Sequence, residues 1–172
     1  SDPSSGLLDL HKSLVKYSSI TYNEQDISQF LASYLEKQGF TVEKQVVAAG
    51  TENKNARHNI FAYSGKSRKT KTLVTSHIDT VPPFWPYERR GSEIWGRGSV
   101  DAKGSVATQI KAVESLLSSG AVSEGDVAML FVVGEETGGD GMRAANDLGI
   151  FWETVIFGEP TELKLASGHK GN

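Results

Sequence analysis

Six side chains of this sequence are of the types that bind divalent metal ions or move protons, and each stands where a predicted element begins or ends. They are His77, Asp79, Asp101, Glu135, Glu136 and Glu159. Five carboxylates gathered at one place repel each other unless a positive charge compensates them. A bound divalent metal ion supplies that charge, and one imidazole with several carboxylates suits zinc, with cobalt or manganese as substitutes. These residues therefore predict a metal centre, if the fold brings them together.

The elements that would position them are the strands of a mostly parallel sheet. The runs 72–76, 127–133 and 154–157 are expected to be strands, and the last two are largely apolar, as is typical of strands buried on both faces. A long amphipathic helix around 106–117 separates the first two runs, and a short helix near 142–148 separates the last two. Such alternation gives right-handed crossovers, and ligands then bind beyond the carboxyl ends of the strands. The candidate side chains are expected at that edge.

The first part of the chain is expected to add two helices and two strands. Helical spacing of apolar residues covers 7–15 and 27–35, and Gly39 is a suitable C-cap for the second helix. The stretches 41–48 and 58–63 are typical of strands, which we expect to pair antiparallel.

Two later segments complete the prediction. The segment 82–98 is rich in proline, glycine and aromatic residues, so it predicts a loop with a short hairpin. The segment 163–167 predicts a last short strand. The fold class that follows is α/β, a three-layer α/β/α domain with a mostly parallel central sheet. An α+β domain with a mixed sheet is the alternative.

Composition is ordinary for a soluble globular domain. The 172 residues are 38% hydrophobic and 23% charged, and the net charge of −3 offers no basic surface for nucleic acid or an anionic membrane. No apolar run approaches the roughly 20 residues of a membrane-spanning helix. The absence of cysteine excludes disulfides and thiolate ligands. The start at Ser1, without methionine, favours a processed and secreted protein, with the cytoplasm as the alternative.

Four motifs, in this order, resemble those of one metallopeptidase family. They are Ser-His-Ile-Asp-Thr-Val-Pro at 76–82, Gly-Arg-Gly-Ser-Val-Asp-Ala-Lys-Gly at 96–104, Gly-Glu-Glu-Thr-Gly at 134–138 and Gly-Glu-Pro-Thr at 158–161. The family contains acetylornithine deacetylase, succinyl-diaminopimelate desuccinylase, aminoacylase and glutamate carboxypeptidase. The residues of the four motifs are most similar to those of its carboxypeptidase-like members. The resemblance implies that 1–167 is the N-terminal part of a zinc-exopeptidase-like catalytic domain. It also implies that 168–172 begins the connection to a lid or dimerisation domain.

The resemblance implies a set of zinc ligands for two ions. His77 and Glu159 would bind the first ion, Glu136 would bind the second, and Asp101 would bridge both. It also implies a cis peptide bond between Asp101 and Ala102, and a second histidine ligand that family members carry later in their chains. A homodimer formed through the lid domain is a further expectation.

The same resemblance implies roles in the reaction for two more residues. Glu135 would act as the general base on the attacking water and pass the proton to the leaving amine. Asp79 would fix the tautomer and orientation of the His77 imidazole. The expected reaction is metal-dependent hydrolysis of a C-terminal peptide bond or of an N-acyl amino acid. The alternatives are a small-metabolite deacylase of the acetylornithine type and a non-catalytic metal-binding fragment.

Each residue also has a structural interpretation that requires no metal ion. The paired acids and the histidine could be solvated charges at strand ends and turns, and Asp101 could be a helix N-cap. We expect His11 and His58 to be ordinary, partly exposed residues. The tryptophans, Trp152 among them, are expected to pack against the fold, and Trp85 is the one that could line a substrate cleft.

Overall fold

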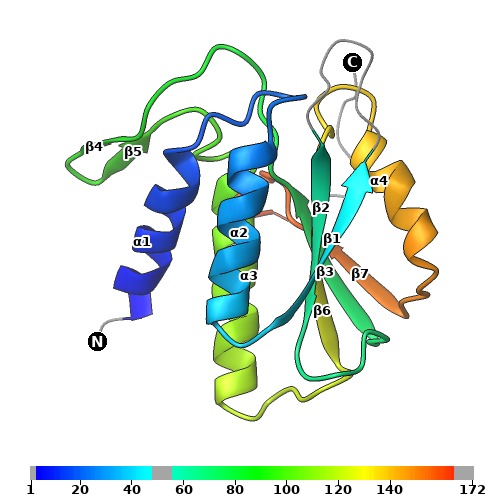
Figure 1. Ribbon diagram of the computed structural model, residues 1–172. Coiled ribbons are helices and arrows are strands. Elements are labelled where there is room, and N and C mark those ends of the chain that lie inside the picture. The colour runs from blue at the N-terminus through cyan, green and yellow to red at the C-terminus, as the bar shows by residue number, and fades with distance from the viewer. Residues whose placement is uncertain (1–2, 48–55, 165–172) are drawn as a thin grey trace.

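A central sheet of five strands with helices on both faces forms the domain (Figure 1). The computed structural model describes residues 3–47 and 56–164. The helices are α1 (Pro3–Val15), α2 (Gln25–Lys37), α3 (Lys103–Ser118), α4 (Asp140–Ala145) and the short 3-10 helix η1 (Asn146–Leu148). The strands of the sheet are β1 (Thr41–Val47), β2 (Arg57–Tyr63), β3 (Thr72–His77), β6 (Val127–Val132) and β7 (Thr154–Phe157). The predicted hairpin is also present, as β4 (Glu88–Arg90) and β5 (Glu93–Trp95).

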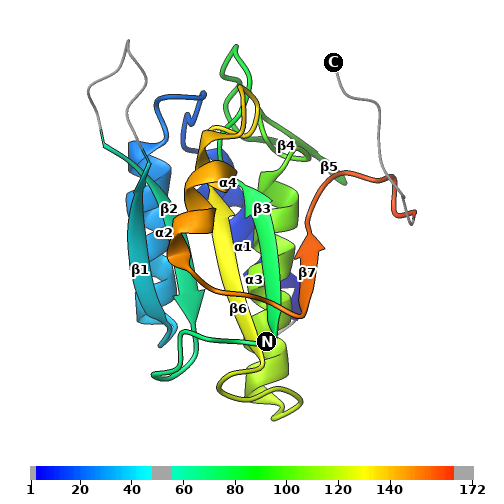
Figure 2. The same ribbon diagram turned by 90° about the vertical axis from the view of Figure 1, so that its right-hand side faces the viewer.

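The strands lie in the order β1-β2-β6-β3-β7, which Figure 2 shows across the sheet. Strand β3 pairs parallel with both β6 and β7, whereas β2 pairs antiparallel with β6 and with β1. Only β2 therefore runs against the others. The predicted mostly parallel sheet and the antiparallel early pair are both confirmed.

Strand β6 explains the continuous apolar run in the sequence. All of its residues are buried, because helices cover both faces of the sheet at its centre. Met129 and Phe131 belong to the core on the side of α1, α2 and α3, and Leu130 and Val132 belong to the smaller core with α4 and η1. Successive side chains of a strand point to opposite faces, so such a strand must be apolar at every position.

Strand β7 differs from its prediction as a buried strand. Val155, Ile156 and Phe157 are 39%, 51% and 65% exposed. The strand pairs with β3 on one side and lies at the edge of the described sheet. An apolar run alone does not reveal whether neighbouring elements cover a strand, and this one is left open to solvent.

The expected strand at 163–167 is not formed where the structure describes it. Leu163 lies in a turn and is fully exposed, and Lys164 lies in a bend. Residues 165–167, and the expected domain connection at 168–172, lie outside the described residues, as does Ala48 at the end of the predicted first strand. Among the helices in the described part of the chain, none has the length and apolarity to cross a membrane.

Candidate metal centre

The carboxyl ends of β3, β6 and β7 meet at one edge of the sheet (Figure 2), and His77 is the last residue of β3. Its ring is 1% exposed. Its Nε2 atom is 2.9 Å from Asp101 Oδ1, 3.7 Å from Glu159 Oε1 and 3.8 Å from Glu135 Oε2. Carboxylates from the start of α3, from the β6–α4 loop and from the segment after β7 therefore surround one ring nitrogen.

These side chains have the chemistry and spacing that a divalent metal ion requires. One ligand atom each from His77, Asp101 and Glu136 lies within 4.8 Å of the other two. Glu159 approaches the same ring nitrogen of His77. An imidazole with carboxylate oxygens is a donor set that suits zinc and related ions, so these residues fit a metal ion. All four predicted ligands are thus brought together at one place.

The electrostatics of the site also favour a bound cation. Burial lowers the pKa of His77, but the carboxylates of Asp101 and Asp79, with Glu159, outweigh it and raise that pKa to about 11. Burial and the neighbouring Asp101 charge raise the pKa of Glu136. The cluster thus strongly favours a cation on the ring, and a metal ion would take the place of that proton.

Asp79 does more in the fold than the sequence predicts. Its backbone oxygen lies 3.0 Å from His77 Nδ1, and its carboxylate Oδ1 lies 3.5 Å from the same atom. The carboxylate, which is fully buried, accepts hydrogen bonds from the backbone N–H groups of Glu135 (3.0 Å) and Glu136 (3.1 Å) and from the hydroxyl of Thr21 (2.8 Å). Asp79 therefore holds the loop that carries two candidate site residues, as well as contacting the histidine.

The start of α3 places the Asp101 carboxylate. The Asp101–Ala102 peptide bond is cis, as the resemblance implies. Ala102 is the N-cap residue of α3, and no side chain caps the helix, so the interpretation of Asp101 as an N-cap is wrong. The next residue, Lys103, is 1% exposed and donates a hydrogen bond from Nζ to Tyr17 O (2.7 Å). Burial lowers the pKa of Lys103 to about 7. These contacts fix the turn from which Asp101 reaches His77.

A buried ion pair behind the β6–α4 loop was not predicted from the sequence. Arg57 donates from Nε and Nη2 to both carboxylate oxygens of Glu24, at 3.1 and 2.9 Å, and the exposed fractions of the two side chains are 1% and 0%. Its Nη1 atom is 3.4 Å from Asp140 Oδ2, at the start of α4. Gly134 has a φ of +68°, and a Cβ atom there would collide with the guanidinium. Arg57 therefore packs against the start of the loop at Gly134 and pairs with Asp140 where α4 begins. Nothing in the local sequence signals this, because the partners lie far apart along the chain.

Three further predictions concern His11, His58 and Trp152. His11, expected to be partly exposed, is buried, and its Nε2 atom is 2.8 Å from Ser99 O, because α1 packs on α3 next to the loop that precedes that helix. Burial lowers its pKa. His58 is partly exposed, as expected. Trp152 packs edge-on against Phe61, with the ring centroids 6.2 Å apart, which confirms its packing role.

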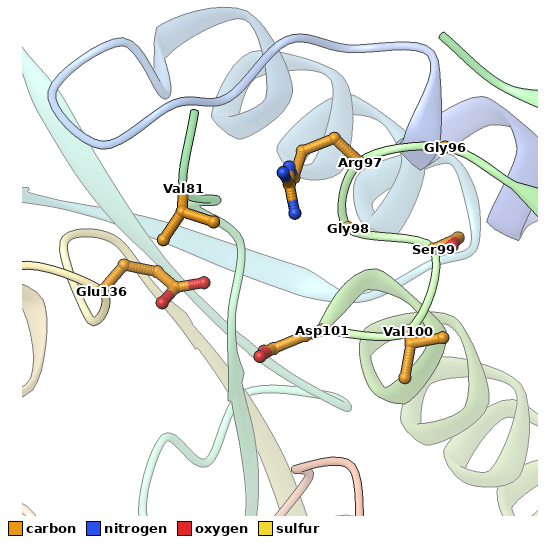
Figure 3. A pocket seen from close by; sticks show the side chains of 8 residues that line it. All are labelled: Val81, Gly96, Arg97, Gly98, Ser99, Val100, Asp101 and Glu136. Carbon is orange, nitrogen blue, oxygen red and sulfur yellow. The ribbon is translucent and has the colours of Figure 1, made fainter. Parts of the chain in front are cut away.

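A pocket adjoins the cluster, and two of the candidate ligands form part of its wall (Figure 3). Its lining residues are Val81, Gly96, Arg97, Gly98, Ser99, Val100, Asp101 and Glu136. The same edge of the sheet therefore combines a fitting set of metal ligands with space for a bound molecule.

Comparison with known proteins places this arrangement in a family. The model of peptidase family M20/M25/M40 matches residues 73–168. A peptidase M20 domain-containing protein of Schizosaccharomyces pombe is 56% identical over 167 residues, which are 96% of this chain and 41% of that protein. A probable carboxypeptidase of Uncinocarpus reesii is 48% identical over 189 residues, covering 97% of this chain and 42% of that protein. The chain spans about two-fifths of the length of these relatives.

Solved structures share the fold. A tripeptidase from Staphylococcus aureus superposes with a TM-score of 0.72 at 23% identity, covering 89% of this chain and 42% of that chain. An M20 family metallo-carboxypeptidase from Sulfolobus solfataricus gives 0.68 at 19% identity, covering 92% and 37%. The family model matches more than half of the chain, through most of the site described above. The chain therefore belongs to peptidase family M20/M25/M40.

Proposed function

We propose that the complete protein carrying this chain is a metal-dependent exopeptidase that hydrolyses the C-terminal peptide bond of a peptide or an N-acyl amino acid. The observation that carries the proposal is the convergence of His77 Nε2 with the carboxylates of Asp101, Glu135 and Glu159. Family membership supports it, and so do relatives named probable carboxypeptidases. Because the chain spans only part of those relatives, the activity is proposed for the complete protein.

His77, Asp101 and Glu159 would hold one zinc ion, and Asp101 and Glu136 would hold the second. When bound, the ions would polarise the scissile carbonyl and lower the pKa of the attacking water. The second ion would have only two carboxylates from this chain, which is a weak set for zinc. We propose that a histidine beyond these 172 residues completes it.

Glu135 is the general base in this proposal. Its carboxylate is half exposed and lies 3.8 Å from His77 Nε2, beside the candidate ligands. Its backbone N–H is fixed by Asp79, which limits where the side chain can reach. Glu135 takes a proton from water as the water oxygen bonds to the carbonyl carbon. It then delivers that proton to the nitrogen of the leaving amine as the C–N bond breaks.

The test is a hydrolysis screen with the complete protein, stripped of metal and reloaded with zinc. Blocked dipeptides are compared with N-acetyl amino acids, and His77→Ala serves as the variant without the central ligand. Release of the C-terminal residue from blocked dipeptides is expected. Turnover of N-acetyl amino acids alone would restrict the proposal to its N-acyl amino acid form, and turnover of N-acetylornithine alone would replace it by the small-metabolite deacylase. Tight zinc binding without any turnover would replace it by a non-catalytic metal-binding protein.

A further inference from the structure

Among the described residues that line the pocket beside the metal centre, Arg97 carries the one basic side chain. Figure 3 shows its guanidinium directed into the space between Val81, Glu136 and Asp101. The two acidic residues are candidate metal ligands, so their charge is directed to the cations in the proposed enzyme. The positive charge of Arg97 has no corresponding role in binding the metal ions.

Four contacts fix the orientation of Arg97. Its backbone N–H donates to Trp85 O (2.9 Å), and its guanidinium lies over the indole ring of Trp85, 4.2 Å from the centroid. Nε donates to Pro83 O (3.0 Å), with Nη2 at 3.5 Å from Pro82 O. The edge of the guanidinium formed by Nε and Nη2 is therefore turned to the backbone of the loop.

The end of the guanidinium is left for a ligand. In the part of the chain that the structure describes, no hydrogen bond or ion pair uses Nη1 of Arg97. The planar end of an arginine presents two parallel N–H groups, which match the two oxygens of a carboxylate. Stacking on an aromatic ring limits the entropy that such a side chain loses on binding.

We propose that Arg97 binds a carboxylate group of the substrate in this pocket and makes the enzyme selective for substrates that carry one. The proposal rests on the proposed function, which places the scissile bond at the adjacent metal ions. In a C-terminal residue the carboxylate is attached to the same Cα atom as the scissile nitrogen. An anion site that shares its walls with the metal ligands is therefore close enough to receive it.

The test compares Arg97→Met with a matched control in the complete, zinc-loaded protein. Arg90→Met is the control, since Arg90 also lies over an indole, that of Trp95 at 4.7 Å, but is exposed on the β4–β5 hairpin and outside the pocket. Blocked dipeptides are assayed as free acids and as C-terminal amides. We expect Arg97→Met to reduce kcat/KM for the acids by about 10- to 100-fold, mainly through KM, as for loss of a hydrogen bond to a charged group. The amides should change little, and Arg97→Lys should recover part of the loss.

A second pair of substrates identifies which carboxylate is bound. N-succinyl and N-propionyl amino acid amides differ only by a carboxylate on the acyl side. A selective loss on the succinyl compound, without one on the dipeptide acids, would assign the contact to the acyl carboxylate. Equal losses with and without a carboxylate in both pairs, or no loss at all, would overturn the proposal.

Equilibrium binding separates this proposal from the proposed function. N-acetyl amino acids and their amides are titrated calorimetrically into the wild-type protein and the Arg97→Met variant, with and without zinc. Tighter binding of the acid that disappears in the variant supports the carboxylate site even if no substrate is hydrolysed, in which case the proposed function is wrong. Hydrolysis with no acid–amide difference between the two proteins leaves the function intact and overturns the role of Arg97.

Discussion

Replacing Asp79 by asparagine is the sharpest test of how the site is held together. The buried carboxylate accepts hydrogen bonds from the N–H groups of Glu135 and Glu136 and from the Thr21 hydroxyl, at 2.8 to 3.1 Å, while its distance to His77 Nδ1 is 3.5 Å. Asparagine keeps the shape but has one acceptor oxygen, so its amide N–H₂ would face at least one of these donors. The geometry predicts that the loop, more than the histidine ring, depends on the charge.

The magnitude follows from the number of bonds at risk. A hydrogen bond to a charged group contributes about 1.5–3 kcal/mol, and an unsatisfied buried N–H adds a cost of similar size. Losing one such bond changes the equilibrium constant between the bonded and the released positions of the loop by a factor of about 10–100. A loss of this size is also usual for metal affinity when an outer-shell partner of a ligand is removed. Asp79→Asn should therefore weaken the ion held by Glu136 by about 10- to 100-fold and reduce turnover through Glu135.

The assay is a zinc titration of the complete protein against a competing chelator, with turnover measured in parallel. Glu136→Gln and His77→Ala serve as references for loss of each ion. Thr21→Val is the graded control, because it removes a single bond to Asp79 and leaves both bonds to the loop. Asp79→Asn could instead lose the same ion as His77→Ala and keep the ion that depends on Glu136. In that case the main role of Asp79 is to orient the imidazole, and our reasoning about the loop is wrong.

Three other variants or conditions test separate parts of the site. Glu135→Gln should keep zinc binding but lose about 10²–10⁴-fold in turnover, since glutamine cannot accept the proton; near-normal turnover would remove Glu135 from the mechanism. Zinc affinity should rise from about pH 6 to about pH 8, because the carboxylates raise the pKa of His77 to about 11 and the ion must displace the proton on that ring. Calorimetry in buffers of different ionisation enthalpy measures the number of protons released. Zinc affinity that falls as the pH rises would contradict this prediction. Arg57→Met should lower the free energy of unfolding, measured in urea, by about 3–5 kcal/mol, because it leaves the Glu24 carboxylate buried and unpaired. Adding Glu24→Gln to this variant should recover part of the loss. An unchanged midpoint of urea unfolding would show that the ion pair contributes nothing to stability.

The positions of the chemical side chains could be predicted from the sequence because they depend on local rules. His77 and Glu136 follow segments predicted to be strands, and Asp101 precedes an amphipathic helix. Parallel strands bring their carboxyl ends to one edge whatever their order. The prediction that these side chains share one place therefore needed no knowledge of neighbouring strands.

The supporting contacts could not be predicted in this way. Arg57 pairs with Glu24 and Asp140, and Thr21 bonds to Asp79, across separations that no periodicity marks. Such pairs depend on which surfaces of the packed elements face one another. A buried charge without a partner is strongly unfavourable, so these contacts are fixed by tertiary packing rather than by propensity.

The sequence by itself determined the elements, the mostly parallel sheet and the residues that meet at its edge, since apolar periodicity and strand ends are encoded locally. Tertiary structure alone decided the burial of His11 and the exposure of β7. His11 is buried because α1 packs on α3, and β7 is exposed because it lies at the edge of the described sheet. Burial is a property of what covers a residue, and α3, which packs on the helix that carries His11, lies far away from it along the chain.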